Sequence, residues 1–196
     1  MIHDKIERGN IMIFCKKNKL TVRGLKCSDK NQIVKWLSDS KILKYYEGRN
    51  NTFDEERVEE KFYNYDVNKT RCIIEYDKKP IGYIQYYIVN EEELKEYGYS
   101  NFNGIIFGTD QFIGETEYLE HGIGTELMKL IINYLSTEKG AEKIVLDPQA
   151  WNERAIKCYE KSGFVKVNLL LKHELHEGEL KDCWLMEYNA RKIDRI

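Results

Sequence analysis

Proline is scarce in this chain, with only Pro80 and Pro148 among 196 residues, and the 13 glycines follow no repeat. A collagen-like or low-complexity chain is therefore excluded. No stretch approaches the ~20 apolar residues that a membrane span needs. The first ten residues, MIHDKIERGN, also lack the apolar core of a secretory signal. We expect a cytoplasmic protein with no membrane contact.

Cysteine and histidine are few and unsuitably spaced for a metal site. The five cysteines form no C-x-x-C pair, and none of the four histidines stands at ligand spacing from a cysteine. No Cys or Ser lies in a recognisable nucleophile constellation. We expect free, buried and inert thiols and no metal ion.

Charge of one sign is not in excess overall, with 33 acidic and 31 basic residues, and 42% of the residues are apolar. These values predict one folded domain over residues 1–196. The charge is nevertheless segregated, because residues 1–50 carry 12 basic and 5 acidic side chains, whereas residues 91–120 carry 8 acidic side chains and Lys95 alone. Such a field attracts a polycation and repels nucleic acid. The alternative is a solvated acidic loop around Glu91 to Glu93.

The hydrophobic periodicity predicts alternating strands and helices in a mixed α/β sheet. Expected strands cover residues 11–15, 20–25, 72–76, 81–89, 105–113, 143–148, 165–171 and 183–188. Four helices are expected from their caps and apolar stripes. The first is capped by Ser28 and the second by a Thr52–Glu55 capping box, with Val58, Phe62 and Tyr65 on its stripe. The third begins at Gly122 and stops at Gly140, and the fourth runs from Asn152 to Gly163.

The turn Gly122 to Thr125 (GIGT) lies between a strand and a helix and is a candidate anion site. Glycines let the backbone approach a phosphate, and the free N–H groups of a helix start point at it. The spacing fits neither a dinucleotide-binding fingerprint nor a Walker loop. Ordinary helix entry is the alternative interpretation.

A second constellation follows 30 residues later, after a strand that ends in LDP: NERAIKCYEKSGF, from Asn152 to Phe164. Together with the glycine turn it resembles the two cofactor motifs of the GNAT superfamily of acetyl-CoA-dependent N-acetyltransferases. The resemblance implies a single domain with a mixed, mainly antiparallel central sheet flanked by helices, and acetyl-CoA as acetyl donor.

Further motifs, including GYIQYY from Gly82, GTDQFIG from Gly108 and HELHEGELKDCWLMEY from His173, narrow the resemblance to bacterial aminoglycoside 6′-N-acetyltransferases. That likeness implies transfer of an acetyl group to the 6′-amine of antibiotics such as kanamycin, and hence resistance. It also implies the cofactor-binding residues Ile113, His121, Gly122, Ile123, Gly124, Thr125, Asn152 and Ala155. Leu119 departs from the superfamily pattern, which has Arg or Gln there, so backbone amides, with Arg154 or Lys157, would hold the pyrophosphate.

The same resemblance implies catalytic roles for two residues. Asp110 would bind and deprotonate the substrate amine, which is chemically reasonable because only the free amine attacks a thioester. Tyr159, two helical turns after Asn152, would donate a proton or a hydrogen bond to the departing thiolate. Without the likeness, Asp110 reads as a capping residue and Tyr159 as a core tyrosine.

A polycationic substrate needs carboxylates and an aromatic wall. By likeness, Asp110, Asp147 and Asp182 supply the carboxylates and Tyr46 the wall. Asp147 can instead cap the turn before Pro148.

The sequence thus predicts direct acetyl transfer to an aminoglycoside within a ternary complex, by a monomer or homodimer. The alternatives are a polyamine or peptide-amine N-acetyltransferase and a non-catalytic acetyl-CoA-binding sensor.

Overall fold

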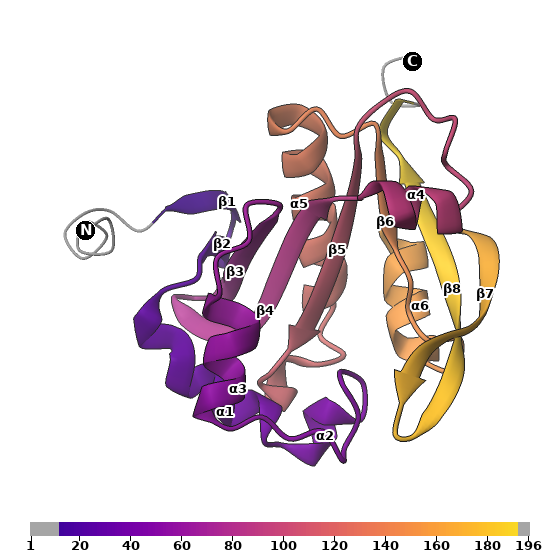
Figure 1. Cartoon of the computed structure of the whole chain (residues 1–196). Helices are drawn as coiled ribbons and strands as arrows, with labels where there is room; N and C mark the ends of the chain where they lie inside the picture. Colours follow the sequence, from indigo (N-terminus) through magenta and orange to yellow (C-terminus); the bar gives the residue numbers. More distant parts are fainter. Residues whose placement is uncertain (1–11, 192–196) are drawn as a thin grey trace.

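The computed structural model describes residues 12–191, which form one open sheet of eight strands with helices on both faces (Figure 1). The strand order is β1-β2-β3-β4-β5-β6-β8-β7. Every neighbouring pair is antiparallel except β5 and β6, which confirms the mixed, mainly antiparallel α/β sheet. The strands are β1 (Ile13–Lys17), β2 (Leu20–Gly24), β3 (Lys69–Tyr76), β4 (Lys79–Ile88), β5 (Ile106–Ile113), β6 (Lys143–Leu146), β7 (Val165–His176) and β8 (Glu179–Asn189). The start of the first predicted strand, residue 11, and the segment 1–10 lie outside the described residues.

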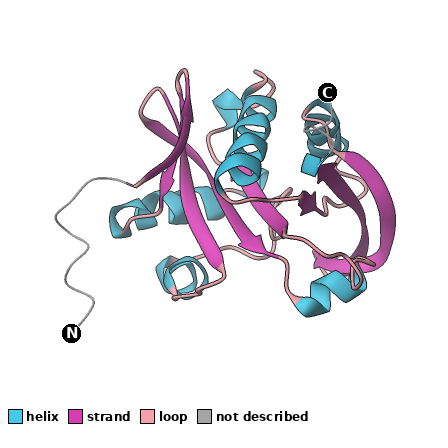
Figure 2. Cartoon of the chain, turned by 90° about the horizontal axis from the view of Figure 1, so that it is seen from above, coloured by secondary structure: helices cyan, strands magenta, loops and turns pink. Residues whose placement is uncertain are grey.

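Helices cover the two faces of the sheet in separate groups, as the view along the sheet shows (Figure 2). On one face, α1 to α3 pack against Ile73, Tyr83 and Phe112, and α4 packs beside them against Ile106 and Val145. On the other face, α5 and α6 pack against the opposite side chains of the same strands. The helices are α1 (Lys30–Leu37), α2 (Ser40–Leu43), α3 (Glu55–Val58), α4 (Glu91–Glu96), α5 (Ile123–Glu138) and α6 (Glu153–Lys161).

Across residues 12–191, none of the helices combines the length and the apolar character that crossing a membrane requires.

Two of the predicted helix starts are confirmed by their cap geometry. The Asn152 side chain accepts a hydrogen bond from the Ala155 N–H at 3.2 Å and so caps α6. Gly122 stands at the start of α5 with φ of 80°, a left-handed conformation that glycine adopts without strain.

The other two predicted caps were wrong, because α1 begins after Asp29 without a side-chain capping hydrogen bond and α3 is capped by an aspartate instead of Thr52. Ser28 lies inside a short 3₁₀ turn that ends at Asp29, whose carboxylate is held by Arg23 at 2.7 Å and by the Lys26 N–H at 2.9 Å. Helix α3 is capped by Asp54, which accepts from the Arg57 N–H, and not by a Thr52–Glu55 box.

The stripe assigned to the second helix was also partly wrong. After α3 the backbone continues as a wider π-helical turn over Glu59–Tyr63, so Val58 and Phe62 are buried but Tyr65 lies beyond the helix and is 90% exposed. The expectation of uniformly buried thiols fails at Cys27, which is exposed, while Cys72 and Cys183 are buried; all five cysteines are free.

The acidic segment after β4, for which a solvated loop was the alternative interpretation, forms helix α4. Asn90 and Glu93 make a reciprocal capping box, with hydrogen bonds of 2.9 and 3.0 Å. Glutamates in a first helical turn are stabilised by the helix dipole. The acidic residues Glu91 to Glu93 are therefore the start of a helix that packs Tyr97, just past its end, against the sheet.

The sheet opens between β5 and β6. These strands pair only from Ile106 to Gly108, opposite Lys143 to Val145, after which β6 ends at Leu146 and β5 continues to Ile113. The second half of β5 therefore has a partner on one side only, and the strands diverge below the label of β6 in Figure 1.

Candidate active site

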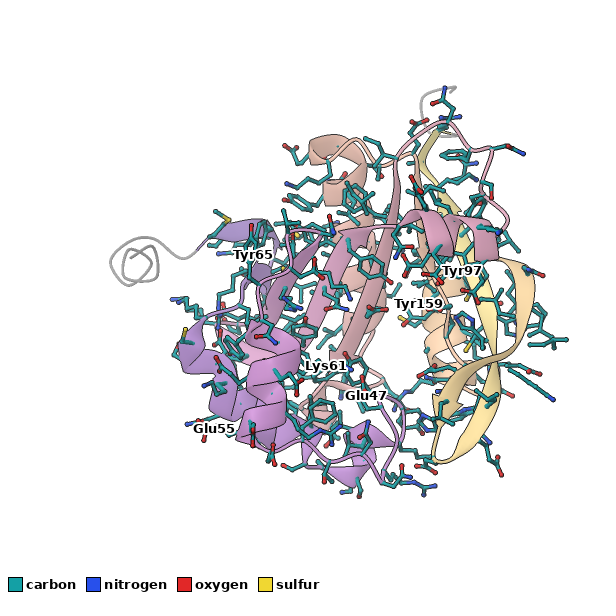
Figure 3. The ribbon with its side chains drawn as sticks, in the orientation of Figure 1. Glu47, Glu55, Lys61, Tyr65, Tyr97 and Tyr159 are labelled. Atoms are coloured by element: carbon teal, nitrogen blue, oxygen red, sulfur yellow. The ribbon has the colours of Figure 1, made fainter. Side chains whose placement is uncertain are left out.

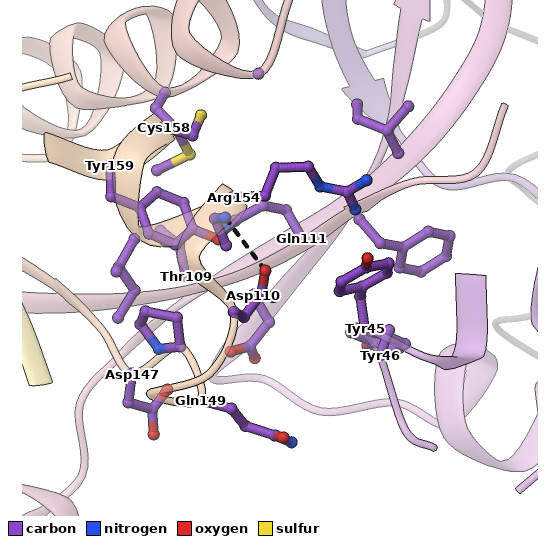
Figure 4. Close-up of a pocket in the computed structure, with 18 of the residues that line it drawn as sticks. Tyr45, Tyr46, Thr109, Asp110, Gln111, Asp147, Gln149, Arg154, Cys158 and Tyr159 are labelled. Carbon is purple, nitrogen blue, oxygen red and sulfur yellow. Dashed lines mark hydrogen bonds between the residues drawn. The ribbon is translucent and has the colours of Figure 1, made fainter. Parts of the chain in front are cut away.

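A cleft of about 840 Å³ lies at this divergence. The second half of β5 forms part of its wall, together with the start of α5, helix α6, the segment after β6, and side chains from α4 and β7 (Figure 4). Ten of the thirteen predicted site residues line it, namely Tyr46, Asp110, Ile113, Gly122, Gly124, Thr125, Asp147, Asn152, Ala155 and Tyr159. His121, Ile123 and Asp182 do not line it.

Strand β5 presents Asp110 and Gln111 to opposite faces of the sheet. Side chains alternate along a strand, so Asp110 shares a face with Ile106 and Phe112, under α1 to α4. Gln111 points to the other face, with Phe107, and reaches Tyr159 of α6. The cleft joins the two faces through the gap beside β6, so a reacting group in the gap would have Asp110 on one side and Tyr159 on the other.

Asp110 is a half-buried carboxylate held by an amide rather than by a cation. Gln85 Nε2 donates to Asp110 Oδ2 at 2.6 Å, and Gln85 Oε1 in turn accepts from the Tyr83 hydroxyl at 2.9 Å. Burial raises the pKa of Asp110 to about 6, the Gln85 hydrogen bond opposes this, and the nearby charge of Asp147 adds to it. A carboxylate with that pKa is ionised at neutral pH and is a competent proton acceptor.

This raised pKa predicts a stability cost that depends on pH. The folded-state pKa is about 6, above the ordinary value of 3.8 for an aspartate, so the ionised form destabilises the fold, and the cost grows as pH rises from about 4 to about 6. Asp110→Asn should therefore raise the free energy of unfolding by about 1–3 kcal/mol above pH ~6.5 and by much less at pH ~4. Denaturant unfolding of both proteins across this range measures the effect, and a variant that is less stable than wild type at neutral pH would contradict it.

Tyr159 is oriented by its neighbour on β5. Gln111 Nε2 donates to the Tyr159 hydroxyl oxygen at 2.6 Å, which leaves the phenolic hydrogen free to donate elsewhere. Burial raises the pKa of Tyr159, so the hydroxyl keeps its proton at neutral pH. The side chain lies in the gap beside Asp110 and Cys158 (Figures 3 and 4). It is thus placed to give a hydrogen bond or a proton inside the cleft.

The start of α5 fits an anionic cofactor. The first hydrogen bond of the helix joins the Glu126 N–H to the Gly122 carbonyl, so the N–H groups of residues 123–125 have no acceptor within the helix. These groups suit phosphate oxygens, and the cationic side chains of Arg154, Lys157 and Lys161 line the same cleft. Ile123 itself is buried in the core, so its contribution would be its backbone alone.

Two buried polar atoms on the cofactor face also lack partners. Thr109 Oγ1 and Gln111 Oε1 have no hydrogen-bond partner among the described residues, and both residues line the cleft. Buried polar groups are rarely left unpaired, so a polar ligand in the cleft would satisfy them. With the helix start, they support a fit for a long polar cofactor such as acetyl-CoA.

Gly124 has a role in helix packing as well as in the candidate cofactor site. A Cβ there would lie 3.1 Å from Cys158 Sγ, so the absent side chain lets α5 approach α6, whereas a Cβ at Gly122 would meet nothing within 4 Å. Gly124→Val should therefore lower the melting temperature as well as weaken acetyl-CoA binding by ~10-fold or more. Adding Cys158→Ala removes the contacting sulfur and should restore most of the stability but not the affinity. Unchanged acetyl-CoA affinity by calorimetry in a folded Gly124→Val protein would remove this turn from the site.

The opposite wall of the cleft is acidic. Asp147, at the end of the strand segment LDP, lies with Glu93, Glu96 and Glu174 along α4 and β7. Asp147 Oδ2 accepts from the Tyr97 hydroxyl at 3.2 Å and lies 2.9 Å from His173 Nε2. These residues give this wall of the cleft a negative field, and Glu93 and Glu96 come from the acidic segment that the sequence singled out.

The remaining predicted residues occupy different places. Tyr46 packs on Phe112 with 4.7 Å between the ring centroids, and burial raises the pKa of its hydroxyl. Asp182 lies on β8, where its carboxylate accepts from the Lys172 N–H at 2.8 Å. His121 is exposed just before α5. Leu119 lines the cleft beside the cofactor turn, where the superfamily pattern has a polar side chain.

Sequence reasoning missed four side chains that hold the others in place: Gln85, Gln111, Glu96 and His173. Gln85 and Gln111 stand on neighbouring strands, opposite Asp110 and Ile84 in the register, so correct strand pairing would have placed Gln85 beside Asp110. Glu96 and His173 meet only through the tertiary fold, and no local pattern pairs them.

A family model described as an acetyltransferase (GNAT) domain matches residues 27–170. The chain therefore belongs to the GNAT family of acetyl-CoA-dependent N-acetyltransferases.

Among curated proteins, the chain is similar to aminoglycoside N(6′)-acetyltransferase type 1 of Klebsiella pneumoniae, with 28% identity over 156 residues that cover 75% of this chain and 74% of that protein. Among solved structures, the aminoglycoside acetyltransferase AAC(6′)-Ib in complex with coenzyme A and kanamycin superposes with a TM-score of 0.72, 24% identity and coverage of 90% and 98% of the two chains. The spermidine N-acetyltransferase of Vibrio cholerae superposes equally well, with a TM-score of 0.73, 21% identity and coverage of 90% and 98%. At these identities the superpositions show a shared fold.

Proposed function

We propose that the protein transfers the acetyl group of acetyl-CoA to the 6′-amine of aminoglycoside antibiotics and so confers resistance to them. The observation that carries the proposal is Asp110, an ionised carboxylate without a cationic partner within 4.0 Å among residues 12–191, at the meeting point of an acidic wall and a cofactor-binding wall. A substrate with several ammonium groups complements that arrangement. The similarity to aminoglycoside 6′-N-acetyltransferases over three quarters of the chain supports the same substrate class.

Residues on the two faces of the sheet act on different reacting groups, the amine on one face and the thiol on the other. Acetyl-CoA supplies an acetyl thioester. Asp110 binds the substrate ammonium and accepts one of its protons, which frees the nitrogen lone pair for attack. Gln85 keeps the accepting carboxylate in place during this step. On the other face, Tyr159 donates a hydrogen bond or proton to the sulfur as the thiol departs, and Gln111 keeps that hydroxyl directed into the gap.

The acidic wall would bind the remaining ammonium groups. Asp147, Glu93 and Glu96 lie on the amine side of the cleft, and Tyr46 offers a ring on which a sugar can pack. Asp182 does not line the cleft, so its proposed contact with substrate depends on a ligand that extends beyond the cleft toward β8.

A polyamine N-acetyltransferase is the second candidate, favoured by the equal fold similarity to a spermidine N-acetyltransferase. The same acidic wall suits a linear polycation, whereas the aromatic ring of Tyr46 favours a sugar ring. A non-catalytic acetyl-CoA sensor remains the alternative outside enzymes, and the oriented pair of Asp110 and Tyr159 argues against it.

Steady-state kinetics with kanamycin, spermidine and a peptide amine separate the candidates. The proposal predicts the highest kcat/KM for kanamycin, with acetylation of one amine per molecule. A preference for spermidine would replace the antibiotic assignment by the polyamine one. Tight binding of acetyl-CoA without turnover on any amine would favour the sensor.

A further inference from the structure

The imidazole of His173 lies between two carboxylates on the acidic wall of the cleft. Its Nε2 lies 2.9 Å from Asp147 Oδ2, and its Nδ1 lies 2.8 Å from Glu96 Oε1. The ring thereby ties β7 to the segment after β6 and to α4. Its side chain is 17% exposed, and its residue lines the cleft.

This geometry requires a charged ring. A neutral imidazole has one N–H donor and one acceptor nitrogen, and an ionised carboxylate can only accept. Two carboxylate oxygens at hydrogen-bond distance from the two nitrogens are therefore satisfied together only by the doubly protonated imidazolium. The hydrogen bond to Asp147 is the largest influence and raises the pKa of His173, and the charges of Asp147 and Glu96 act in the same direction against its burial.

The groups that surround the His173 ring include no second cation in contact with Asp147 or Glu96 among the described residues. Across residues 12–191, His173 is the only basic side chain within 4.0 Å of either carboxylate. Tyr97 from α4 donates its hydroxyl to the same Asp147 oxygen, with its ring centroid 6.3 Å from the imidazole. Glu93 of α4, Glu174 of β7 and Asp110 of β5 line the same cleft and add negative charge, while Lys172, next to it in β7, is exposed. Lys69 of β3 and Tyr87 of β4 line the cleft from the far side of Asp110.

We propose that the His173 imidazolium is a resident counter-ion of the acceptor subsite, which holds Asp147 and Glu96 in the free enzyme and is replaced there by an ammonium group of the substrate. This inference rests on the proposed function, since it requires a polycationic acceptor. The exchange balances in charge, because one ammonium enters the subsite and His173 releases one proton to solvent. His173 is thus a positioning residue that sets how tightly the acceptor binds as pH changes.

The direction of the pH effect follows from this exchange. Below the raised pKa of His173 the ring is charged and competes with the substrate for the two carboxylates, whereas above it the neutral ring no longer does. Acceptor affinity should therefore increase as His173 loses its proton. Ammonium groups of the substrate lose protons over part of the same range, so the comparison of variants, rather than the wild-type profile alone, isolates His173.

The test combines two variants with calorimetry. His173→Gln removes the charge and His173→Lys makes it permanent. At about pH 6.5, kanamycin should bind His173→Gln about 5-fold more tightly than wild type and His173→Lys more weakly than wild type. Calorimetry in buffers of different ionisation enthalpy should show up to one proton fewer released on kanamycin binding to His173→Gln. Acetyl-CoA binding is the internal control and should differ little among the three proteins. If both variants bind kanamycin more weakly than wild type with unchanged proton release, His173 is a structural link only and the proposal is overturned.

An NMR measurement tests the counter-ion role of His173 independently of which amine is acetylated. In histidine-selective NMR titrations, the resonance absent from His173→Gln identifies His173, and its pKa should fall when either kanamycin or spermidine is added. A fall with spermidine alone, with turnover of spermidine but not kanamycin, would refute the aminoglycoside assignment and leave the counter-ion role intact. An unchanged pKa with both polycations would overturn the counter-ion role, whichever amine is acetylated.

Discussion

Asp110→Asn should lower kcat with kanamycin by ~10²-fold or more, the usual scale for loss of a positioned base, while the affinity for acetyl-CoA changes little. Asparagine keeps the shape and can still accept the Gln85 hydrogen bond through its own oxygen. The variant therefore removes the proton acceptor rather than the architecture of the site. In wild type, kcat/KM should fall as pH drops through about 6, since the carboxylate pKa is about 6 and only its ionised form is active.

Asp77→Asn is the matched control for that result. Asp77 has the same carboxylate on the exposed turn between β3 and β4, where its φ of 52° suits asparagine as well as aspartate. It should have near wild-type kinetics. Near-normal turnover in Asp110→Asn at neutral pH would mean that water or another group deprotonates the amine, and Asp110 would then be a binding residue only.

Tyr159→Phe should lower kcat by ~10-fold to 10²-fold, because the hydroxyl that faces the leaving thiolate is lost. Gln111 Nε2 would then lose its hydrogen-bond acceptor, so the Gln111 side chain would be held less firmly in addition to the loss of the proton donor. A more acidic leaving thiol needs less help, so the defect should shrink with an acetyl thioester of a low-pKa thiol. Measuring kcat for both donors in both proteins tests this dependence.

Tyr65→Phe provides the comparison for the tyrosine variant, since Tyr65 is 90% exposed and lies away from the cleft. It should leave kcat unchanged with both donors. If Tyr159→Phe lowers kcat equally with the two acetyl donors, Tyr159 positions the cofactor and does not protonate the leaving thiolate.

The parts of the fold that the sequence predicted correctly depend on local signals. The stripe of α5, the cap at Asn152 and the glycine turn at Gly122 are all determined within a few residues of the chain. The two wrong caps show the limit of such signals. At the first, Asp29 is bound by Arg23 from a neighbouring strand, a contact that no helix pattern records. At the second, the charged carboxylate of Asp54, two residues after Thr52, accepts the capping hydrogen bond.

The sequence predicted the site residues that lie in recognisable motifs. It did not predict the contacts between elements that are far apart in the chain. Asp110 and Tyr159 came from motifs, and the structure brings both to one cleft. The acidic run after β4 gave the correct sign of charge but not the helical conformation, because its capping box at Asn90 was not recognised. His173 meets Glu96 across 77 residues and Asp147 across 26, so their ion pairs depend on how β7, the edge strand beyond β8, approaches α4 and the segment after β6.

The most direct test of the proposed activity compares two aminoglycosides that differ at a single position. Neomycin carries an amine at the 6′ position and paromomycin a hydroxyl, with the other amines in common. Release of thiol from acetyl-CoA should be rapid with neomycin and close to background with paromomycin, with the new acetyl group on the 6′-nitrogen in the mass and NMR spectra of the product. Equal rates with the two antibiotics, or acetylation at any other amine, would contradict the account.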